Sequence, residues 1–420
     1  MNLLHVNAAY PPFLGGAEVY TQAMSERFAD HGHRVTVVTT TAAEVERFWN
    51  PRKRHLPAGL ERRNGVEVIR YPVSHLPLSP WSFYVLRRLA TIIARWSTVS
   101  APVLRQLAPQ MPGVPGIEEG LSELPGPFDL VHGVNIALEW PLIAAWRYAR
   151  DQGLPFVTTP FVHVGEQGSQ DVLINYTMPH QLEVLRDANA VMVQTEIEKR
   201  ALIHLGVRED RLHRLGMGVD LNRLRGGDAA RFRGRHDLDG RPIVTFLGVV
   251  TYDKGSFYLV RAMERLWAQG CGAHLVIAGP QVDEFSRFYE RLPSATRDHV
   301  LLLGPVLGRD KRDLLAATDV FALPSRIDSF GIVYLEAWVY GKPVIGARAG
   351  GVPDVINDGE DGLLVDFGDV EALAAAIGAL LRKPERAQTM GRQGRAKVKA
   401  RYTWTHIYDR LGAVYTRLVK

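Results

Sequence analysis

Two carboxylates stand eight residues apart in the second half of the chain, where they could bind a phosphorylated ligand. Asp328 or Ser329 can cap a helix that starts at this point. The backbone of residues 330–333 would then offer free N–H groups to a diphosphate. Glu336 falls in an otherwise apolar stretch, where a buried acid is costly without a partner. We therefore expect Glu336 to contact a ligand, about 12 Å further along if the segment is helical.

A lysine stands where another helix is expected to begin. Lys254 precedes Gly255 and a helical pattern. The N-terminal end of a helix is already positive, so a lysine there is electrostatically unfavourable unless an anion is bound. The sequence thus indicates a phosphate beside Lys254, and a solvated lysine next to Asp253 is the alternative.

Two pairs of adjacent glycines and one histidine also follow apolar runs. Gly15-Gly16 and Gly350-Gly351 can let backbone approach a ligand closely, and a turn with positive φ is the alternative for Gly15-Gly16. His163 can take or deliver a proton near neutral pH. Because the chain has 14 histidines, a hydrogen-bonded loop histidine is the alternative there.

All these residues follow apolar runs of strand length. Many of the runs are continuously apolar, which is typical of parallel strands covered on both faces. Each run precedes a helical pattern, and the two series of such units predict an α/β protein with two Rossmann-like domains. The expected strands cover residues 3–8, 34–40, 66–70, 129–133, 155–159 and 190–194, then 243–247, 274–278, 300–303, 320–323, 343–346 and 362–365.

A stretch rich in Gly, Asp and Arg separates the two series, at residues 217–241. We expect an N-terminal domain of residues 1–217, a C-terminal domain of residues 218–403, and a last helix, 404–420, that crosses back to the first domain. The proline-rich residues 109–127 are predicted to form a loop. Ligands of open α/β sheets bind beyond the carboxyl ends of the strands, so the candidate residues imply a central cleft between two facing parallel sheets.

Composition excludes several classes of protein. The 420 residues are 46% hydrophobic and 23% charged, as in soluble globular proteins. The net charge of +5 is too small to indicate nucleic-acid binding. Cys271 is the only cysteine, which rules out an internal disulfide and a cysteine-cluster zinc site. No apolar run of membrane-spanning length and no signal-peptide pattern is visible, so we expect a cytoplasmic protein.

The motifs along nearly the whole chain resemble the family 4 retaining glycosyltransferases, which have the GT-B fold. The resemblance is most specific from Pro324 to Asp354. The motifs are Gly15-Gly16-Ala17-Glu18, Val193-Gln194-Thr195-Glu196, Lys254-Gly255, Ala278-Gly279-Pro280, Pro324-Ser325-Arg326, Asp328-Ser329-Phe330-Gly331 through Glu336, Gly341-Lys342-Pro343-Val344 and Gly350-Gly351-Val352-Pro353-Asp354.

The resemblance implies an activity and its substrates. A hexose-type sugar would pass from a nucleotide diphosphate sugar, with UDP or GDP, to a hydroxyl of a glycan, lipid-linked or small-molecule acceptor. The anomeric configuration would be retained, and no metal or other cofactor would be required. The partners would thus be a sugar nucleotide and a hydroxyl acceptor, and no nucleic acid.

The resemblance also assigns roles to single residues. Glu336 would bind the donor ribose and Asp328 the donor sugar, while Lys254 would hold the phosphates. His163 would lie near the donor sugar and the acceptor. The implied donor-binding residues are Gly15, Gly16, Lys254, Asp328, Phe330, Gly331, Ile332, Val333, Glu336, Gly350 and Gly351, and the implied catalytic residues are His163, Lys254, Asp328 and Glu336.

The sequence departs from the family pattern at two positions. Asp328 stands where the family usually has glutamate, and Val249 follows Gly248 where the family usually has arginine. Charge on the leaving diphosphate would therefore rest on Lys254, on helix N-termini and on Arg326 or Arg348.

The mechanism follows from charge development. The leaving diphosphate becomes more negative while the sugar becomes oxocarbenium-like. Because no carboxylate is placed as a nucleophile on the opposite sugar face, we favour a front-face route in which the leaving phosphate helps to deprotonate the acceptor.

Other functions remain open at this point. A non-catalytic nucleotide-sugar-binding protein is one alternative. A nicotinamide-dependent Rossmann oxidoreductase is another, although no Gly-x-Gly-x-x-Gly motif follows a strand with an acid about 20 residues on. A sugar-nucleotide epimerase and a phosphorylase are also conceivable on this fold.

A basic segment in the first half indicates where an acceptor or a membrane could bind. Residues 46–100 hold ten Lys and Arg against three acids, a local charge of +7. Residues 81–96 are amphipathic at helical spacing. One interpretation is an interfacial helix at the inner face of the membrane, and the other is a core helix with a solvated arginine edge. The basic stripe is Arg87, Arg88, Thr91 and Arg95, and the apolar face is Val85, Leu86, Leu89, Ile92, Ile93 and Trp96.

Overall fold

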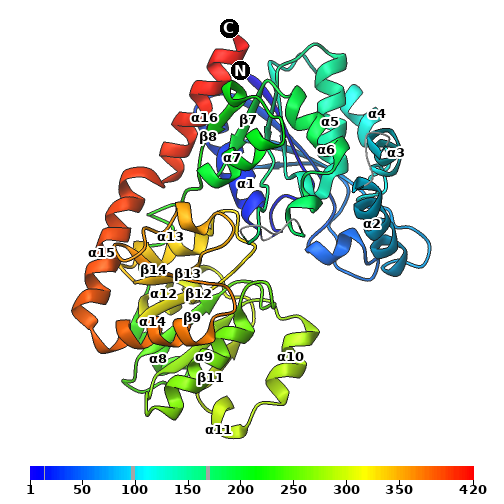
Figure 1. The fold of residues 1–420 in the computed structure, drawn as a ribbon. Helices are drawn as coiled ribbons and strands as arrows, with labels where there is room; N and C mark the ends of the chain where they lie inside the picture. Colours follow the sequence, from blue (N-terminus) through cyan, green and yellow to red (C-terminus); the bar gives the residue numbers. More distant parts are fainter. Residues whose placement is uncertain (14, 96–99, 167–170) are drawn as a thin grey trace. The chain divides into compact units, whose positions relative to one another are not determined.

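The computed structural model describes residues 1–13, 15–95, 100–166 and 171–420, and these form two compact units (Figure 1). Unit 1 comprises Met1–His163, Gln170–Gly216 and Ile407–Lys420. Unit 2 comprises Val164–Ser169 and Met217–His406. The chain therefore passes from unit 1 to unit 2 directly after His163 and again after Gly216, and it returns to unit 1 for its last residues, Ile407–Lys420.

Unit 1 is built on an eight-stranded sheet with the order β3-β4-β2-β1-β5-β6-β7-β8. All neighbouring strands are parallel except β3, which pairs antiparallel with β4 at the edge. The strands are β1 (Asn2–Asn7), β2 (Arg34–Thr40), β3 (Gly59–Arg63), β4 (Val66–Tyr71), β5 (Leu130–Val134), β6 (Phe156–Thr159), β7 (Ala190–Val193) and β8 (Leu212–Arg214). From β4 to β7 the order is that of a Rossmann fold. The strands are added on one side of β1 up to β4 and on its other side from β5 onward, so the order reverses between β1 and β5.

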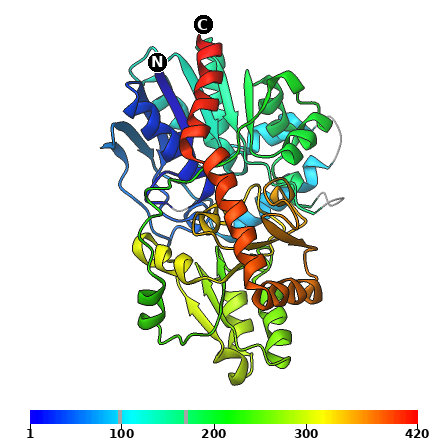
Figure 2. The same cartoon turned by 90° about the vertical axis from the view of Figure 1, so that its left-hand side faces the viewer.

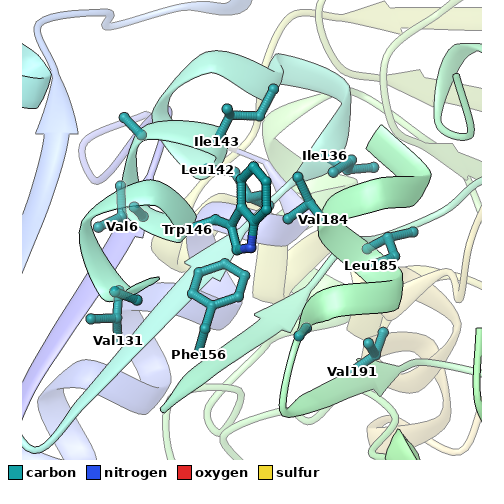
Figure 3. Close-up of a cluster of buried hydrophobic side chains, with 14 of the residues drawn as sticks. Val6, Val131, Ile136, Leu142, Ile143, Trp146, Phe156, Val184, Leu185 and Val191 are labelled. Atoms are coloured by element: carbon teal, nitrogen blue, oxygen red, sulfur yellow. The ribbon is translucent and has the colours of Figure 1, made fainter. Parts of the chain in front are cut away.

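Helices cover this sheet and supply its core. Figure 3 shows Trp146 of α5 against Phe156 of β6, with Val184 and Leu185 of α6 beside them. The helices are α1 (Gly16–Asp30), α2 (Trp81–Ala94), α3 (Ser100–Leu107), α4 (Ile117–Ser122), α5 (Glu139–Asp151), α6 (Pro179–Asp187) and α7 (Glu196–His204), with 3-10 turns η1 (Val45–Phe48), η2 (Ile136–Leu138), η3 (Leu173–Asn175) and η4 (Glu209–Arg211).

Unit 2 is built on a fully parallel six-stranded sheet with the order β11-β10-β9-β12-β13-β14. This is again a Rossmann order, and it reverses between β9 and β12. The strands are β9 (Ile243–Leu247), β10 (His274–Ala278), β11 (Val300–Leu303), β12 (Val320–Leu323), β13 (Val344–Ala347) and β14 (Gly362–Val365). The helices are α8 (Ala229–Arg235), α9 (Ser256–Ala268), α10 (Asp283–Glu290), α11 (Ser294–Arg297), α12 (Gly308–Ala317), α13 (Ile332–Val339), α14 (Val370–Arg382) and α15 (Pro384–Arg401), with η5 (Val352–Asp354).

The prediction of two Rossmann-like parallel sheets is confirmed, and every expected strand is present within one residue at each end. Two strands, β3 and β8, were not expected from the sequence. Strand β3 is exposed and polar at the sheet edge, and β8 has only three residues, so neither produces an apolar run. Residues 109–127 are not simply a loop, because α4 lies within them. Within the described ranges, no helix combines the length and the apolar character needed to cross a bilayer.

Most of the last helix, α16 (Trp404–Val419), belongs to unit 1 and lies along it (Figure 2). A buried polar network attaches it there. The hydroxyl of Tyr415 hydrogen-bonds to His132 Nδ1 and, at 3.2 Å, to His5 Nε2. The second ring nitrogens bond to Ser25 and Thr159, each at 2.8 Å. Burial lowers the pKa of His5 to about 3 and the pKa of His132 well below its usual value, so both rings are neutral in the fold.

This network predicts an acid-sensitive attachment of α16. An unfolded histidine takes up a proton below about pH 6.5, whereas folded His5 does not until about pH 3. Stability contributed by His5 is therefore present above pH 6.5 and is lost as the pH falls, by about 2 kcal/mol at pH 5. We expect the melting temperature of His5→Gln to fall less between pH 7.5 and pH 5 than that of the wild type.

The matched control is His204→Gln, because His204 is an exposed histidine of the same unit. It should lose as much stability on acidification as the wild type. An equal acid response in His5→Gln would show that the network does not govern the acid sensitivity of this unit.

Candidate active site

The centre of the candidate site in unit 2 is the point where the sheet order reverses. The loops after β9 and β12, residues 248–255 and 324–331, leave neighbouring strands there. Gly255 is left-handed, with φ of 76°, and a Cβ built on it would lie 2.2 Å from the carbonyl oxygen of Pro324. Only glycine allows these two loops to touch at this position.

Two polar contacts hold the loops together. The backbone N–H of Arg326 donates to the carbonyl of Asp253 at 3.0 Å, and its Nε donates to the Asp253 carboxylate at 2.8 Å. Lys254 Nζ donates to Asp328 Oδ1 at 2.8 Å, and both side chains are mostly buried. The partner of Lys254 is therefore Asp328 and not the neighbouring Asp253.

The start of α13 differs from the expected capped helix. The helix begins at Ile332, and its N-cap is Gly331 with φ of 81° and no side-chain hydrogen bond, so neither Asp328 nor Ser329 caps it. The left-handed Gly331 interrupts the backbone, so the distance of about 12 Å, which assumed a helix from Asp328 to Glu336, does not apply. Phe330 is buried, and the N–H groups of Ile332 and Val333 lie in the first turn, where no intrahelical acceptor exists.

Glu336 lies on α13 and has a partner that the sequence analysis missed. Lys311 of α12 donates to Glu336 Oε1 at 2.6 Å. Lys311 therefore already compensates the charge of this buried acid, and the expected contact between Glu336 and a ligand stays a prediction. The second oxygen, Oε2, is buried and has no hydrogen-bond partner among the described residues. Such an oxygen is a ready acceptor for a ligand hydroxyl.

Gly350 and Gly351 follow β13 and lie against the Asp328 backbone. The N–H of Gly351 donates to the Asp328 carbonyl at 2.8 Å, and that of Gly350 donates to the carbonyl of Gly165 at 2.7 Å. Gly350 is left-handed, and a Cβ there would lie 2.3 Å from the Asp328 oxygen. The structure thus brings Gly350, Gly351, Asp328 and Lys254 together.

The arginines considered as substitutes for Val249 are engaged elsewhere. Val249 itself is 45% exposed. Arg326 pairs with Asp253 and lies over two aromatic rings, and Arg348 pairs with Asp358. Of the three cations considered, Lys254 is the one paired with a candidate site carboxylate.

The glycine pair of unit 1 lies at the start of α1, after β1. Gly15 is extended, with φ of −164°, and Gly16 is the first helical residue, so the turn with positive φ considered above does not occur. A Cβ on Gly15 would lie 2.1 Å from Glu18 Oε2, whereas a Cβ on Gly16 would meet nothing within 4 Å. Burial raises the pKa of Glu18 to about 7. Gly15 therefore makes room for Glu18, and Gly16 leaves open space at the helix start.

His163 is half-buried after β6, and its surroundings were not predicted. Its ring stacks on Tyr176 with the centroids 4.7 Å apart. Glu198 of α7 accepts hydrogen bonds from the N–H of Val162 at 2.8 Å and of Gln194 at 2.6 Å. Burial raises the pKa of Glu198 to about 7 against the lowering effect of these bonds. Glu198 thus fixes the residue before His163.

The candidate residues fall into two sets, one in each unit. Gly15, Gly16 and His163 belong to unit 1, and the other candidates belong to unit 2. Tyr176 and Lys311 left no pattern in the sequence, whereas Glu198 stands three residues after Thr195, which is the spacing of a capping box. In the described part of the chain, no group of three or more His, Cys, Asp or Glu side chains could hold a metal ion.

Comparison with known proteins assigns the chain to a family through matches in both of its halves. The model of glycosyltransferase family 4 matches residues 14–223, and the model of glycosyl transferases group 1 matches residues 228–397. The chain belongs to glycosyltransferase family 4. It is therefore a glycosyltransferase rather than an oxidoreductase.

Relatives and solved structures agree with this family. A D-inositol 3-phosphate glycosyltransferase of Nocardia farcinica is 28% identical over 96% of this chain and 84% of its own length. A GDP-mannose-dependent alpha-(1-6)-phosphatidylinositol monomannoside mannosyltransferase of Mycolicibacterium smegmatis is 36% identical over 46% of this chain and 53% of its own length.

Solved structures show the fold. Anabaena HepE in complex with UDP-glucose has a TM-score of 0.71 at 18% identity, with both chains fully covered. Sucrose-phosphate synthase of Thermosynechococcus elongatus has a TM-score of 0.71 at 21% identity, covering 100% of this chain and 99% of the other. The fold of this family 4 glycosyltransferase is GT-B.

The bonds of Glu198 predict that it positions His163. In Glu198→Gln an amide N–H₂ would face one of the two backbone N–H groups, so Val162 and His163 should shift. We expect the turnover number for sugar transfer to fall about 10- to 100-fold, with little change in KM for the donor.

The matched control is Glu196→Gln in the first turn of the same helix, which should leave turnover and melting temperature unchanged. If Glu198→Gln lowers the melting temperature but keeps the wild-type turnover number, the two bonds serve stability alone.

Proposed function

We propose that this glycosyltransferase moves a hexose-type sugar from a UDP or GDP sugar to a hydroxyl of a glycan, lipid-linked or small-molecule acceptor, with retention of configuration. The observation that carries the proposal is the charge arrangement at the reversal point of unit 2. A lysine, two acids and an uncapped helix start lie there, and one acid keeps a buried oxygen open.

The diphosphate of the donor would be held by Lys254 and by the first turn of α13. Lys254 supplies a full charge, and the N–H groups of Ile332 and Val333 supply the positive end of the helix dipole. Both stabilise the charge that grows on the leaving diphosphate. We propose that no metal ion is needed for this purpose.

Glu336 would bind the ribose of the nucleotide. Its Oε2 is buried and open among the described residues, while Lys311 fixes the orientation of the carboxylate through Oε1. A ribose hydroxyl is a donor of the right kind for a buried carboxylate oxygen.

Asp328 would accept hydrogen bonds from hydroxyls of the donor sugar. Its carboxylate is held by Lys254, and its backbone is packed against Gly350 and Gly351. An aspartate has one methylene fewer than the usual glutamate, so its carboxylate stays closer to the backbone. The sugar would therefore sit close to the backbone groups of Gly350 and Gly351.

The reaction would follow a front-face route. The bond from the sugar to the diphosphate breaks, the acceptor oxygen attacks from the same side, and a leaving phosphate oxygen takes the acceptor proton. Lys254 and the α13 start stabilise the leaving group, and His163 would lie near the donor sugar and the acceptor.

The names of related proteins support the choice of donor and acceptor. The Mycolicibacterium enzyme is GDP-mannose-dependent, and the Anabaena protein is in complex with UDP-glucose. Inositol 3-phosphate and a phosphatidylinositol mannoside are the acceptor groups in the relatives' names, a small molecule and a lipid.

Nucleotide binding tests the proposal. UDP or GDP should raise the melting temperature of the wild type, whereas NADH should not. Glu336→Gln should lose most of this response, because its carboxylate no longer meets the ribose. The sugar nucleotide that is turned over should give a product with the donor's anomeric configuration by NMR.

Glu371→Gln is the control, since it breaks an exposed ion pair of the same unit with Arg265. A wild-type nucleotide response in Glu336→Gln would refute the ribose assignment, and a trapped glycosyl-enzyme adduct would refute the front-face route.

Lys254 provides a kinetic test of the diphosphate site. In Lys254→Met the leaving group loses its cation, and we expect the turnover number to fall about 10²- to 10³-fold. Lys397→Met breaks a similarly buried Lys–Asp pair elsewhere in unit 2, with Asp361. This control should lower the melting temperature and leave turnover nearly unchanged, and equal losses of turnover would refute the assignment.

A further inference from the structure

Large apolar side chains are exposed to solvent on α2 and just before it. Six of the twelve exposed ones in the described part of the chain lie between residues 78 and 92. Soluble proteins rarely expose apolar side chains in such a cluster unless it binds something. They are Leu78 at 87% exposure, Trp81 at 76%, Tyr84 at 49%, Val85 at 58%, Leu89 at 48% and Ile92 at 39%.

Four of these side chains form one stripe on the helix, which we call the outer face of α2. Trp81, Val85, Leu89 and Ile92 recur at intervals of three and four residues, so they project from one side of the helix. The exposed Arg88 falls within the same stripe.

A different set of side chains attaches α2 to unit 1. Ala90 is buried in a cluster with Leu104 of α3 and with Met111 and Met178, and Leu86 packs against that cluster. The inner face therefore accounts for the place of α2 in the fold (Figure 1). The outer face has no such partner among the described residues.

The arginines are distributed differently from the sequence prediction. Arg87 does not belong to a solvated edge, because it reaches inward to the buried Glu139 at 3.3 Å and to the carbonyl of Asn175 at 2.8 Å. Arg88 and Arg95 are exposed. Trp96, which was expected to extend the apolar face, lies outside the described residues.

Further positive charge borders the N-terminal end of α2. The ring of Trp49 lies 5.8 Å from Phe83 and 6.2 Å from Tyr84, which joins the turn after η1 to the helix. Arg52 and Arg54 of that turn are exposed. The acids near this region are Glu44, which accepts the Arg54 N–H, Glu46 near Tyr84, and Asp171, which pairs with Arg95 at 3.5 Å. Residues 46–95 carry a net charge of +7.

We propose that the outer face of α2 docks on the surface of an anionic phospholipid bilayer. Val85, Leu89 and Ile92 would enter the boundary between headgroups and acyl chains, and Trp81 would lie at the headgroup level, as aromatic rings do. Arg88 and Arg95 would meet lipid phosphates, because the negative surface of such a bilayer attracts basic side chains that lie next to it. The proposal does not depend on the donor or on the reaction.

Charge distinguishes this partner from a second copy of the chain. A two-fold dimer through the outer face would bring the same patch against itself. The arginines of both copies would then oppose each other, which disfavours the contact. An anionic lipid surface instead supplies the opposite charge and an apolar layer together.

Vesicle flotation with the full chain tests the proposal. The protein should float with vesicles of phosphatidylcholine and phosphatidylglycerol in equal parts, and much less with phosphatidylcholine alone. Raising the salt concentration should weaken the binding, since exposed charges are screened.

Two double variants separate the apolar and the charged contributions. Trp81→Ser with Val85→Ser should abolish flotation at every salt concentration. Arg88→Gln with Arg95→Gln should weaken binding to the anionic vesicles and reduce the salt dependence. The controls are Leu60→Ser with Leu307→Ser, which removes two equally exposed apolar side chains elsewhere, and Arg200→Gln with Arg395→Gln.

All four variants should keep the wild-type melting temperature, so loss of binding cannot be ascribed to unfolding. The proposal is overturned if the wild type does not float with anionic vesicles, or if Trp81→Ser with Val85→Ser floats as well as its control. A dimer on size exclusion that this variant disrupts, without flotation of the wild type, would assign the outer face to a second copy.

Discussion

The ion pair between Lys254 and Asp328 is the interaction on which the site in unit 2 depends. It can form only because β9 and β12 are neighbours at the reversal of the sheet order, so that the loops carrying these two residues, 74 positions apart in the chain, leave the same edge. The left-handed Gly255 then allows one loop to touch the carbonyl of Pro324. A lysine and an acid thus stand at one place without burying an uncompensated charge, which would cost several kcal/mol.

Two other acids of unit 2, Asp361 and Glu336, are buried and paired with lysine, and they differ in whether an oxygen is left without a hydrogen bond. Asp361 accepts from the N–H of Asn357 through one oxygen and pairs with Lys397 through the other, so both oxygens are used within the fold. Glu336 pairs with Lys311 through Oε1 and leaves Oε2 open among the described residues. The ion pair alone therefore does not mark a binding site. The unused acceptor distinguishes Glu336 from a purely structural acid.

The sequence predicts well what depends on hydrophobic periodicity and on turn residues, namely the buried strands and the position of polar residues after them. It predicts poorly what depends on pairing between distant elements. Asp328 looks like a helix cap, but the left-handed Gly331 starts α13 three residues later and releases Asp328 to pair with Lys254. Lys311 meets Glu336 and Glu198 meets Val162 only in the folded chain, and no local pattern records these two contacts.

Helix α2 also shows that the sequence does not reveal which side of an amphipathic helix packs against the fold. Its period reveals apolar and basic stripes, yet the period cannot tell which stripe faces inward. The structure turns Arg87 inward, where it holds the carbonyl of Asn175, and the next residue, Tyr176, stacks on His163. One helix therefore has an inner face that braces the neighbourhood of the candidate catalytic histidine and an outer face whose apolar side chains the fold does not use. Because both faces belong to one helix, a partner that holds the outer face would also restrain Arg87, whose bond to Asn175 lies next to the Tyr176 ring that stacks on His163.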